Sequence, residues 1–272
     1  QYPGIRESID SDVDNLASLL RVSGLLPKHM DMSPLLAEAK SQLHEEADYE
    51  QEARYLNAFV RALGDDERFL LPRVIPSLSS SRILGMTFVP GQPIEDVAHA
   101  DASERNRVAA LLFELFLVEL FKLRLVQTDP NFANYQYNPE TGQVVLLDFG
   151  ASRRFKAALV RGFRDLLARA IAGDRPGMIN AAESIGYQLG PDSSSYQQTL
   201  LELADIALVP LTVNKPYDFG RSPIPQQLMQ RLERLRSNST FWQVPPIDVA
   251  YIHRKIGGLV MLATRLNAEI NV

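Results

Sequence analysis

The stretch QTDPNFANYQYNPETGQVVLLDFGASR, residues 127–153, decides how the rest of the chain is interpreted. Asp129 is followed five positions later by Asn134, and Asp148 opens an Asp-Phe-Gly triplet fourteen positions after that. The apolar run 144–147 leads directly into the triplet, which is typical of a buried β-strand. Phosphoryl transfer requires such a set: a carboxylate that orients the acceptor and oxygen ligands that hold Mg²⁺ against the phosphates. The stretch therefore predicts part of a phosphotransferase site.

The order and spacing of these residues match the protein-kinase pattern of a catalytic-loop Asp, an Asn five residues later and the Asp of Asp-Phe-Gly. A second Asp-Phe-Gly at 218–220 provides an internal control, because it follows Asn214-Lys215-Pro216 without a preceding apolar strand. We predict loop structure there and no catalytic role. A polar hairpin would explain Asp129 and Asp148 separately but would not explain their joint order.

The loop also departs from ordinary protein kinases. Gln127-Thr128 stands where those kinases have His-Arg, and no Ala-Pro-Glu follows Asp148. Activation by a phosphate on a neighbouring loop therefore lacks its usual arginine anchor. We do not expect the substrate-docking parts of an ordinary protein kinase.

The composition is that of a globular protein. The 272 residues are 46% hydrophobic and 22% charged, which allows one large domain or two lobes. The net charge of −5 disfavours a general nucleic-acid binder, whose surface would be basic. The most apolar segment, 111–126, contains four charged residues and is too short to span a bilayer, so we predict a buried helix there.

Hydrophobic periodicity and turn residues give the order of the elements. Helices are predicted over 7–22 and 33–63, short strands over 69–76 and 82–89, a helix from 101 to 125, a strand over 144–148, and then helices only. Those last helices are expected over 155–172, 175–188, 193–209, 225–237 and 247–269. The fold class is therefore α+β with a helical C-terminal half.

The acidic segment EEADYEQEA, residues 45–53, is the second candidate site. On one continuous helix, Glu46 and Asp48 would point about 200° apart, whereas Glu45, Asp48 and Glu52 would share a face. Composition alone favours a solvated helix face over a ligand site.

Five phrases, taken together, resemble the UbiB (AarF) family of atypical protein-kinase-like proteins, which is associated with ubiquinone biosynthesis. They are QYPGI (1–5), EEADYEQEA (45–53), QTDPNFANY (127–135), LLDFGASR (146–153) and HRKIGG (253–258). They follow one another in the family's order over nearly the whole chain. The resemblance implies a kinase-like fold with a partial N-lobe at 1–89, which ends at a hinge, and a helical C-lobe at 90–272.

The resemblance also implies the roles of individual residues. Asp129 would be the catalytic Asp, and Asn134 and Asp148 would be the Mg²⁺ ligands. The hinge whose backbone meets the adenine of ATP would be formed by Met86, Thr87, Phe88 and Val89. Glu46 and Asp48 would carry the family's Glu-x-Asp signature, which restrains access of nucleotide or substrate.

Other parts of the family's nucleotide site would precede the sequence. The resemblance places the phosphate-binding Lys of a strand, an Ala-rich loop and a Lys-x-Gly-Gln extension before Gln1. We therefore expect the chain to be a fragment that lacks the start of the N-lobe. The helix Glu that pairs with this Lys would fall near Gln42, with Glu38 and Glu45 as alternatives, and its identity stays open.

The leading hypothesis is an ATP- and Mg²⁺-dependent UbiB-like kinase or ATPase that supports ubiquinone biosynthesis. Its partners would be the nucleotide and ubiquinone-biosynthesis proteins or lipid precursors. Its place would be the bacterial cytoplasm or the mitochondrial matrix, peripheral to the inner membrane. One alternative is a pseudokinase-like scaffold that binds partners or lipid precursors. Another is a small-molecule phosphotransferase of the aminoglycoside or choline kinase type, which Gln127-Thr128 and Phe149-Gly150 disfavour.

Overall fold

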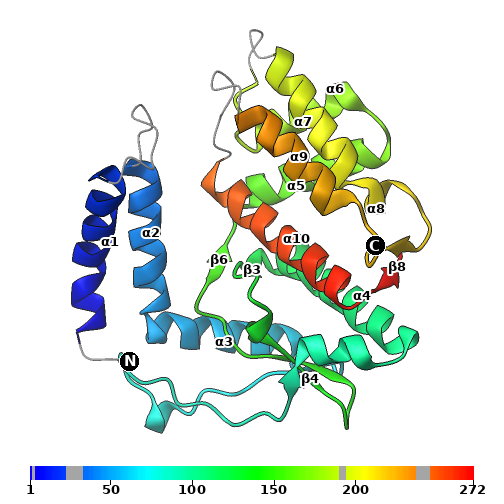
Figure 1. The fold of residues 1–272 in the computed structure, drawn as a ribbon. Coiled ribbons are helices and arrows are strands. Elements are labelled where there is room, and N and C mark those ends of the chain that lie inside the picture. The colour runs from blue at the N-terminus through cyan, green and yellow to red at the C-terminus, as the bar shows by residue number, and fades with distance from the viewer. Residues whose placement is uncertain (2–3, 23–32, 190–193, 237–245) are drawn as a thin grey trace. The chain divides into compact units, whose positions relative to one another are not determined.

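The computed structural model of the chain describes residues 1, 4–22, 33–189, 194–236 and 246–272 (Figure 1). Two residues of the phrase at 1–5, Tyr2 and Pro3, lie outside the described residues. The chain divides into two compact units, the first formed by 1–91 with 138–152 and the second by 92–137 with 153–272. The division into lobes at 1–89 and 90–272 remains a prediction.

Among its described residues, the first unit contains three α-helices and a short parallel strand pair. Its elements are α1 (Ile5–Val22), α2 (Ser33–Glu46), α3 (Tyr49–Leu63), β1 (Phe69–Leu70), the 3-10 turn η1 (Pro76–Leu78) and β5 (Gln143–Leu146). β1 pairs with β5 in the register Phe69↔Val144 and Leu70↔Val145. The predicted strand before Asp148 is thus present as β5, although it ends at Leu146.

α1 and α2 lie side by side in antiparallel directions (Figure 1). Lys40 Nζ lies 2.8 Å from Asp14 Oδ1, and His44 Nε2 lies 3.2 Å from Asp10 Oδ1. α1 buries three apolar side chains at helical spacing, those of Ile9, Val13 and Ala17. The helix predicted over 7–22 is therefore present as α1, but its leucines at 16 and 19 are exposed, so the predicted apolar face is buried only in part.

The single helix predicted over 33–63 is wrong, because the structure has two helices there. α2 ends at Glu46 and α3 begins at Tyr49, with Asp48 as the N-cap of α3. The Asp48 carboxylate accepts the backbone N–H of Gln51 at 3.0 Å, which satisfies a donor that the first turn of a helix leaves free. Because of this break, the common helix face expected for Glu45, Asp48 and Glu52 does not exist.

The buried face of α3 holds the Asp-Phe-Gly triplet of the first unit. Leu56 and Phe59 are fully buried and lie seven and four residues before Leu63, where α3 ends. The Phe59 ring packs against the ring of Phe149 with 4.8 Å between the centroids. This aromatic contact fixes the triplet's backbone against α3.

The two strands predicted over 69–76 and 82–89 are mostly absent as strands. β1 covers only Phe69–Leu70, and the rest is held by single β-bridges between Val74 and Met86 and between Ser80 and Ile83. Pro72 and Pro76 explain the interruption, because proline has no N–H to donate to a β-ladder.

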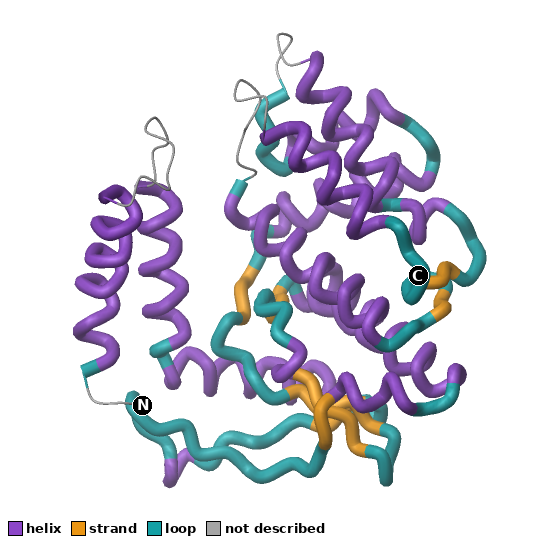
Figure 2. Tube along the Cα trace, viewed as in Figure 1, coloured by secondary structure: helices purple, strands orange, loops and turns teal. Residues whose placement is uncertain are grey.

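The second unit is predominantly helical (Figure 2). Its first half contains β2 (Gln92–Pro93), η2 (Ile94–His99), α4 (Ala102–Val118), η3 (Glu119–Leu123), β3 (Leu125–Gln127), η4 (Phe132–Asn134) and β4 (Tyr135–Asn138). Its second half contains β6 (Ser152–Arg154), α5 (Ala157–Ile171), α6 (Arg175–Ser184), α7 (Ser194–Ala207), α8 (Val209–Thr212), β7 (Tyr217–Asp218), α9 (Ile224–Arg236), α10 (Ile247–Arg265) and β8 (Glu269–Ile270). β2 and β4 pair antiparallel, with Gln92 opposite Tyr137. Within the described ranges, none of the helices combines the length and hydropathy needed to cross a membrane.

The helix predicted to run from 101 to 125 ends earlier. α4 ends at Val118 and continues as one π-helical turn, η3, after which Arg124 adopts a left-handed conformation with φ of 52°. A left-handed residue stops a helix, and strand β3 then begins at Leu125. Single π-helical turns are frequent at functional sites, and this one is followed by β3 and then by the loop that carries Asp129.

In the second Asp-Phe-Gly, Asp218 lies in strand β7, which was not predicted, whereas Phe219 and Gly220 lie in the bend and turn that follow it, as the predicted loop requires. β7 pairs antiparallel with β8, with Asp218 opposite Glu269. The Phe219 ring is fully buried, 5.5 Å from the ring of Phe113 and 5.0 Å from that of Tyr217. Phe219 is therefore a core residue of the second unit.

Candidate active site

The loop that carries Asp129 and Asn134 follows a fully buried strand in the second unit. Gln127 and Thr128 are 4% and 3% exposed, so the chain leaves the core only at Asp129. Asn134 is 7% exposed, and its Nδ2 donates a hydrogen bond to Asp129 Oδ2 at 2.8 Å. This bond turns the amide nitrogen of Asn134 toward Asp129 and leaves the amide oxygen on the other side of the group. The structure thus brings together two of the predicted site residues.

The second oxygen of Asp129 also has a partner. Arg254 Nη2, on helix α10, donates to Asp129 Oδ1 at 2.9 Å. The Asp129 side chain is 25% exposed, so one edge of the carboxylate still faces solvent. An ionised carboxylate can accept about four hydrogen bonds, which leaves capacity for an acceptor hydroxyl or a water.

Asp148 belongs to the first unit, where it follows the buried strand β5. Its Oδ1 accepts the backbone N–H of Gly150 at 2.9 Å, and its side chain is exposed. The next residue, Phe149, is 2% exposed and packs against Phe59. The triplet therefore anchors its Phe in the core and presents its Asp at the surface of the unit.

Glu52 is the residue of this site that the sequence reasoning missed. It lies on α3, four and seven residues before the buried Leu56 and Phe59, so it projects from the same helix face. Burial, which is the largest cause, and the nearby Asp148 carboxylate together raise the pKa of the Glu52 carboxyl to about 7, although a hydrogen bond from the backbone N–H of Phe149 opposes the shift. The spacing of 52, 56 and 59 was a usable signal, but the assumption of one long helix assigned Glu52 to the acidic face.

The raised pKa of Glu52 predicts a pH-dependent stability. Between the ordinary carboxyl pKa of about 4.5 and the native value of about 7, the folded state binds more protons than the unfolded state. The stabilisation is complete below the lower value and is lost as pH rises through about 7. In buffer free of divalent cations, we expect the free energy of unfolding in urea to fall between pH 5 and pH 8 by on the order of 2 kcal/mol.

Glu52→Gln should remove the part of this pH dependence that Glu52 causes and should make the variant more stable than the wild type at pH 8. The part caused by Glu119, whose pKa burial also raises to about 7, should remain. Glu50→Gln is the matched control, because Glu50 lies on the exposed side of α3. If Glu52→Gln and Glu50→Gln have the same dependence of unfolding free energy on pH, the assignment of a proton to Glu52 is wrong.

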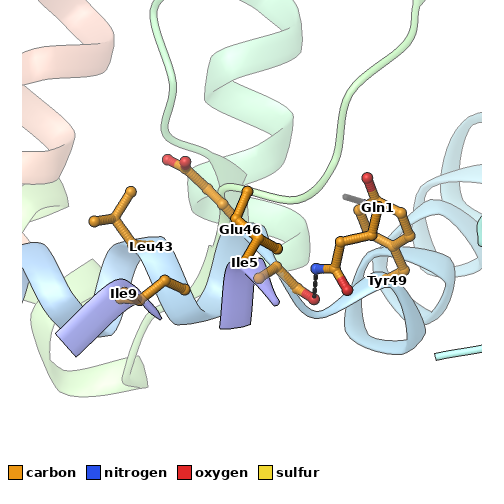
Figure 3. A pocket seen from close by; sticks show the side chains of 7 residues that line it. Gln1, Ile5, Ile9, Leu43, Glu46 and Tyr49 are labelled. Atoms are coloured by element: carbon orange, nitrogen blue, oxygen red, sulfur yellow. Dashed lines mark hydrogen bonds between the residues drawn. The ribbon is translucent and has the colours of Figure 1, made fainter. Parts of the chain in front are cut away.

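Glu46 and Asp48 occupy different helices and have different surroundings. Glu46 is the last residue of α2, and its Oε1 accepts a hydrogen bond from Gln42 Nε2 at 3.0 Å. Glu46 lines a hollow of about 480 Å³ together with Ile5 and Ile9 of α1, and Figure 3 shows these three side chains. Asp48 is engaged in capping α3. The Glu-x-Asp pair therefore marks the junction between two helices.

The predicted hinge residues lie in extended backbone of the first unit. The N–H of Thr87 donates to the carbonyl of Arg73 at 2.9 Å, and Met86 forms the bridge to Val74. Phe88 is 90% exposed. The backbone N–H of Thr87 is thus already paired, and the Phe88 side chain projects into solvent.

The fold and these two groups of residues define a protein-kinase-like protein of an atypical kind. The first unit carries a helix with a half-buried glutamate against the Asp-Phe-Gly segment, and the second carries the Asp129–Asn134 loop on a helical scaffold. The loop contains Gln127-Thr128 instead of His-Arg.

Comparison with known proteins gives the family. Residues 1–182 match the family model of the ABC1 atypical kinase-like domain, and the chain belongs to this family. It is 34% identical over 275 residues to "Atypical kinase coq-8, mitochondrial" of Caenorhabditis elegans, a match that covers 100% of this chain and 36% of that protein. It is 33% identical over 273 residues to "Atypical kinase COQ8, mitochondrial" of Saccharomyces cerevisiae, with 100% of this chain and 54% of that protein covered. The resemblance to UbiB-type atypical kinases is thereby confirmed.

The chain spans about a third to a half of the length of these curated relatives. A solved structure titled "The complex structure of Rv3197-erythromycin from Mycobacterium tuberculosis" has a TM-score of 0.70 to this chain at 20% identity. The match covers 100% of this chain and 67% of that one. At this identity the likeness concerns the fold, and it confirms the α+β, kinase-like fold class predicted from the sequence.

Proposed function

We propose that this chain carries the catalytic residues of an ATP- and Mg²⁺-dependent phosphotransferase or ATPase that supports ubiquinone biosynthesis. The observation that carries the proposal is the 2.8 Å hydrogen bond between Asn134 and Asp129 in a loop that leaves a buried strand. In protein kinases, a catalytic-loop Asp orients the acceptor and an Asn follows it five residues later. Asp129 and Asn134 have this spacing, and the bond joins their side chains. Membership of an atypical kinase family supports the same reaction class.

Asp129 is proposed to orient the acceptor. Its carboxylate would accept a hydrogen bond from the attacking hydroxyl or water and take up that proton as the oxygen bonds to the γ-phosphorus of ATP. The bond between this phosphorus and ADP breaks in the same step, and ADP leaves. When bound, ATP with Mg²⁺ supplies the phosphoryl group and the positive charge that stabilises its transfer. Asn134 and Asp148 are proposed to hold the metal, because amide and carboxylate oxygens are the donors that Mg²⁺ prefers.

Glu52 is proposed as the helix glutamate that pairs with the phosphate-binding Lys, in place of Glu38 or Glu45. The support is its position: it lies half-buried beside Asp148, where burial and that neighbouring carboxylate raise its pKa to about 7. A cation placed beside Glu52 would offset this unfavourable burial and would stabilise the ionised form. In protein kinases the Lys–Glu ion pair and the Asp of Asp-Phe-Gly must be in place together, which matches the closeness of Glu52 to Asp148.

Further roles are proposed from the resemblance. Met86, Thr87, Phe88 and Val89 would contact the adenine through their backbone, in an N-lobe at 1–89 joined to a C-lobe at 90–272. Glu46 and Asp48 would restrain access of nucleotide or substrate at the junction of α2 and α3. The partners would be ubiquinone-biosynthesis proteins or lipid precursors. The place of action would be the mitochondrial matrix or the bacterial cytoplasm, at the periphery of the inner membrane.

The test is phosphate release from ATP by the purified full-length protein, with Mg²⁺ and with EDTA. We expect turnover that requires Mg²⁺. Binding of Mg-ATP without turnover would contradict an enzyme and would favour the scaffold. Phosphorylation of choline or an aminoglycoside in the same assay would instead indicate a small-molecule phosphotransferase.

A further inference from the structure

Three residues of helix α10 contact the loop that carries Asp129. Arg254 donates to Asp129, 125 residues earlier in the chain. Lys255 Nζ donates to Gln127 Oε1 at 3.0 Å and to the hydroxyl of Tyr135. At Gly258 the helix and Pro130 approach so closely that a Cβ added there would lie 2.3 Å from Pro130 Cβ.

Helical periodicity explains why these contacts occur together. Residues 254 and 258 are four apart and residues 255 and 258 are three apart, so all three lie on one face of α10. This face contacts Gln127 before Asp129, Asp129 itself, and Pro130 directly after it. It also contacts Tyr135 at the end of the loop. The loop between Gln127 and Tyr135 contains no Lys or Arg of its own, so α10 supplies its cations.

Lys255 is an unusual anchor because its side chain is 2% exposed. Burial alone lowers the pKa of Lys255, but the Glu119 carboxylate and the Tyr135 hydroxyl raise it overall, so the lysine is charged. Glu119, also 2% exposed, lies 3.8 Å from Lys255 in the turn η3 that leads into β3. The buried ammonium group of Lys255 therefore bonds both to Gln127, before Asp129, and to Tyr135, at the end of the loop.

We propose that α10 positions the catalytic loop, with Arg254 orienting the Asp129 carboxylate, Lys255 fixing both ends of the loop and Gly258 allowing Pro130 to seat on the helix. The catalytic meaning of this arrangement rests on the proposed function, in which Asp129 orients the acceptor. Arg254, Lys255 and Gly258 are positioning residues, because each acts through the loop.

The test compares two adjacent glycines of α10. Gly258→Ala adds a methyl group that collides with Pro130, whereas Gly257→Ala adds one with no atom within 4 Å. Both changes replace a helical glycine by alanine, so their effects on helix propensity are the same. In the full-length protein, we expect Gly258→Ala to lower kcat for ATP turnover by about 10- to 100-fold with an unchanged KM for ATP, and Gly257→Ala to behave as the wild type.

Amide hydrogen exchange of residues 128–135 is measured on the same variants, because it reports loop order without requiring turnover. We expect faster exchange in Gly258→Ala and in Arg254→Met, partial recovery in Arg254→Lys, and no change in Gly257→Ala. Loop exchange at wild-type rates in both Gly258→Ala and Arg254→Met overturns the proposal. If the wild type does not turn over ATP, the proposed function fails, and loop exchange alone still decides whether α10 positions the loop. If Gly258→Ala does not fold, Arg254→Met, which alters a partly exposed side chain, decides.

Discussion

Asp148→Asn is expected to reduce ATP turnover by about 10²- to 10³-fold, whereas Asp218→Asn is expected to leave it unchanged. Both variants convert the Asp of an Asp-Phe-Gly triplet into its uncharged isostere, so the chain provides its own matched control. Asp148 presents an exposed carboxylate after β5 and beside Glu52, where it is proposed to hold the metal. Loss of that charge removes the strongest type of oxygen ligand for Mg²⁺.

Asp218 has a different setting. It lies in β7, its Oδ1 accepts the backbone N–H of Arg221 at 3.1 Å, and the following Phe219 is part of the core. The measurement is phosphate release at saturating ATP as a function of Mg²⁺ concentration for both variants of the full-length protein. Equal turnover of the two variants, whether both active or both inactive, would contradict the assignment of Asp148 to the metal.

Lys255→Met is expected to destabilise the protein by about 3–5 kcal/mol, the largest effect on stability that we predict. The substitution leaves the buried Glu119 carboxylate without its cation and removes the donor that Gln127 and Tyr135 share. Breaking one partner of a buried ion pair is costly because the remaining Glu119 carboxyl stays out of water, where it must keep an unpaired charge or bind a proton; burial already raises its pKa to about 7. Unfolding in urea at pH 7.5 measures the difference in free energy.

The double variant Glu119→Gln with Lys255→Met is the control for the ion pair. Because it buries no net charge, it should recover a large part of the stability that the single change removes. It should not restore the contacts of Lys255 to the loop, so the loop amides should still exchange faster than in the wild type. A double variant as unstable as Lys255→Met would show that lost packing, and not an unpaired charge, causes the destabilisation.

The parts of the site that could be predicted are those that local sequence determines. Asp129 and Asn134 are five residues apart, and their hydrogen bond closes within a single loop. The strand before Asp148 is a continuous apolar run, and it forms β5. The helical second half follows local periodicity in part, since α5 and α10 lie within the ranges expected for them. The prediction of helices only after the strand at 144–148 is wrong, because β6, β7 and β8 also lie there.

Glu52 was missed because a capping interaction competes with helix continuation. The pattern over 33–63 contains no Gly or Pro inside the break, so nothing in the periodicity marks it. The Asp48 side chain accepts a hydrogen bond from the backbone N–H of Gln51. This local bond competes with a helical conformation at Asp48, so one helix ends and the next begins there. With α3 starting at Tyr49, the spacing of Glu52, Leu56 and Phe59 becomes that of one buried face.

The contacts of α10 could not be predicted for a different reason. Arg254 and Asp129 are separated by 125 residues, and a single sequence does not reveal which distant residues meet. Arg254 and Lys255 also look alike in sequence, as two adjacent cations in a helix. Only the packing of α10 makes one of them a partner of Asp129 and buries the other with Glu119.

The most direct test of the central claim is ATP turnover by the full-length protein and by Asp129→Asn, with the affinity for Mg-ATP measured in parallel. We predict Mg²⁺-dependent phosphate release by the wild type, a loss of about 10²- to 10⁴-fold in Asp129→Asn, and equal affinity of both proteins for Mg-ATP. Phosphate release by Asp129→Asn at the wild-type rate would contradict the account.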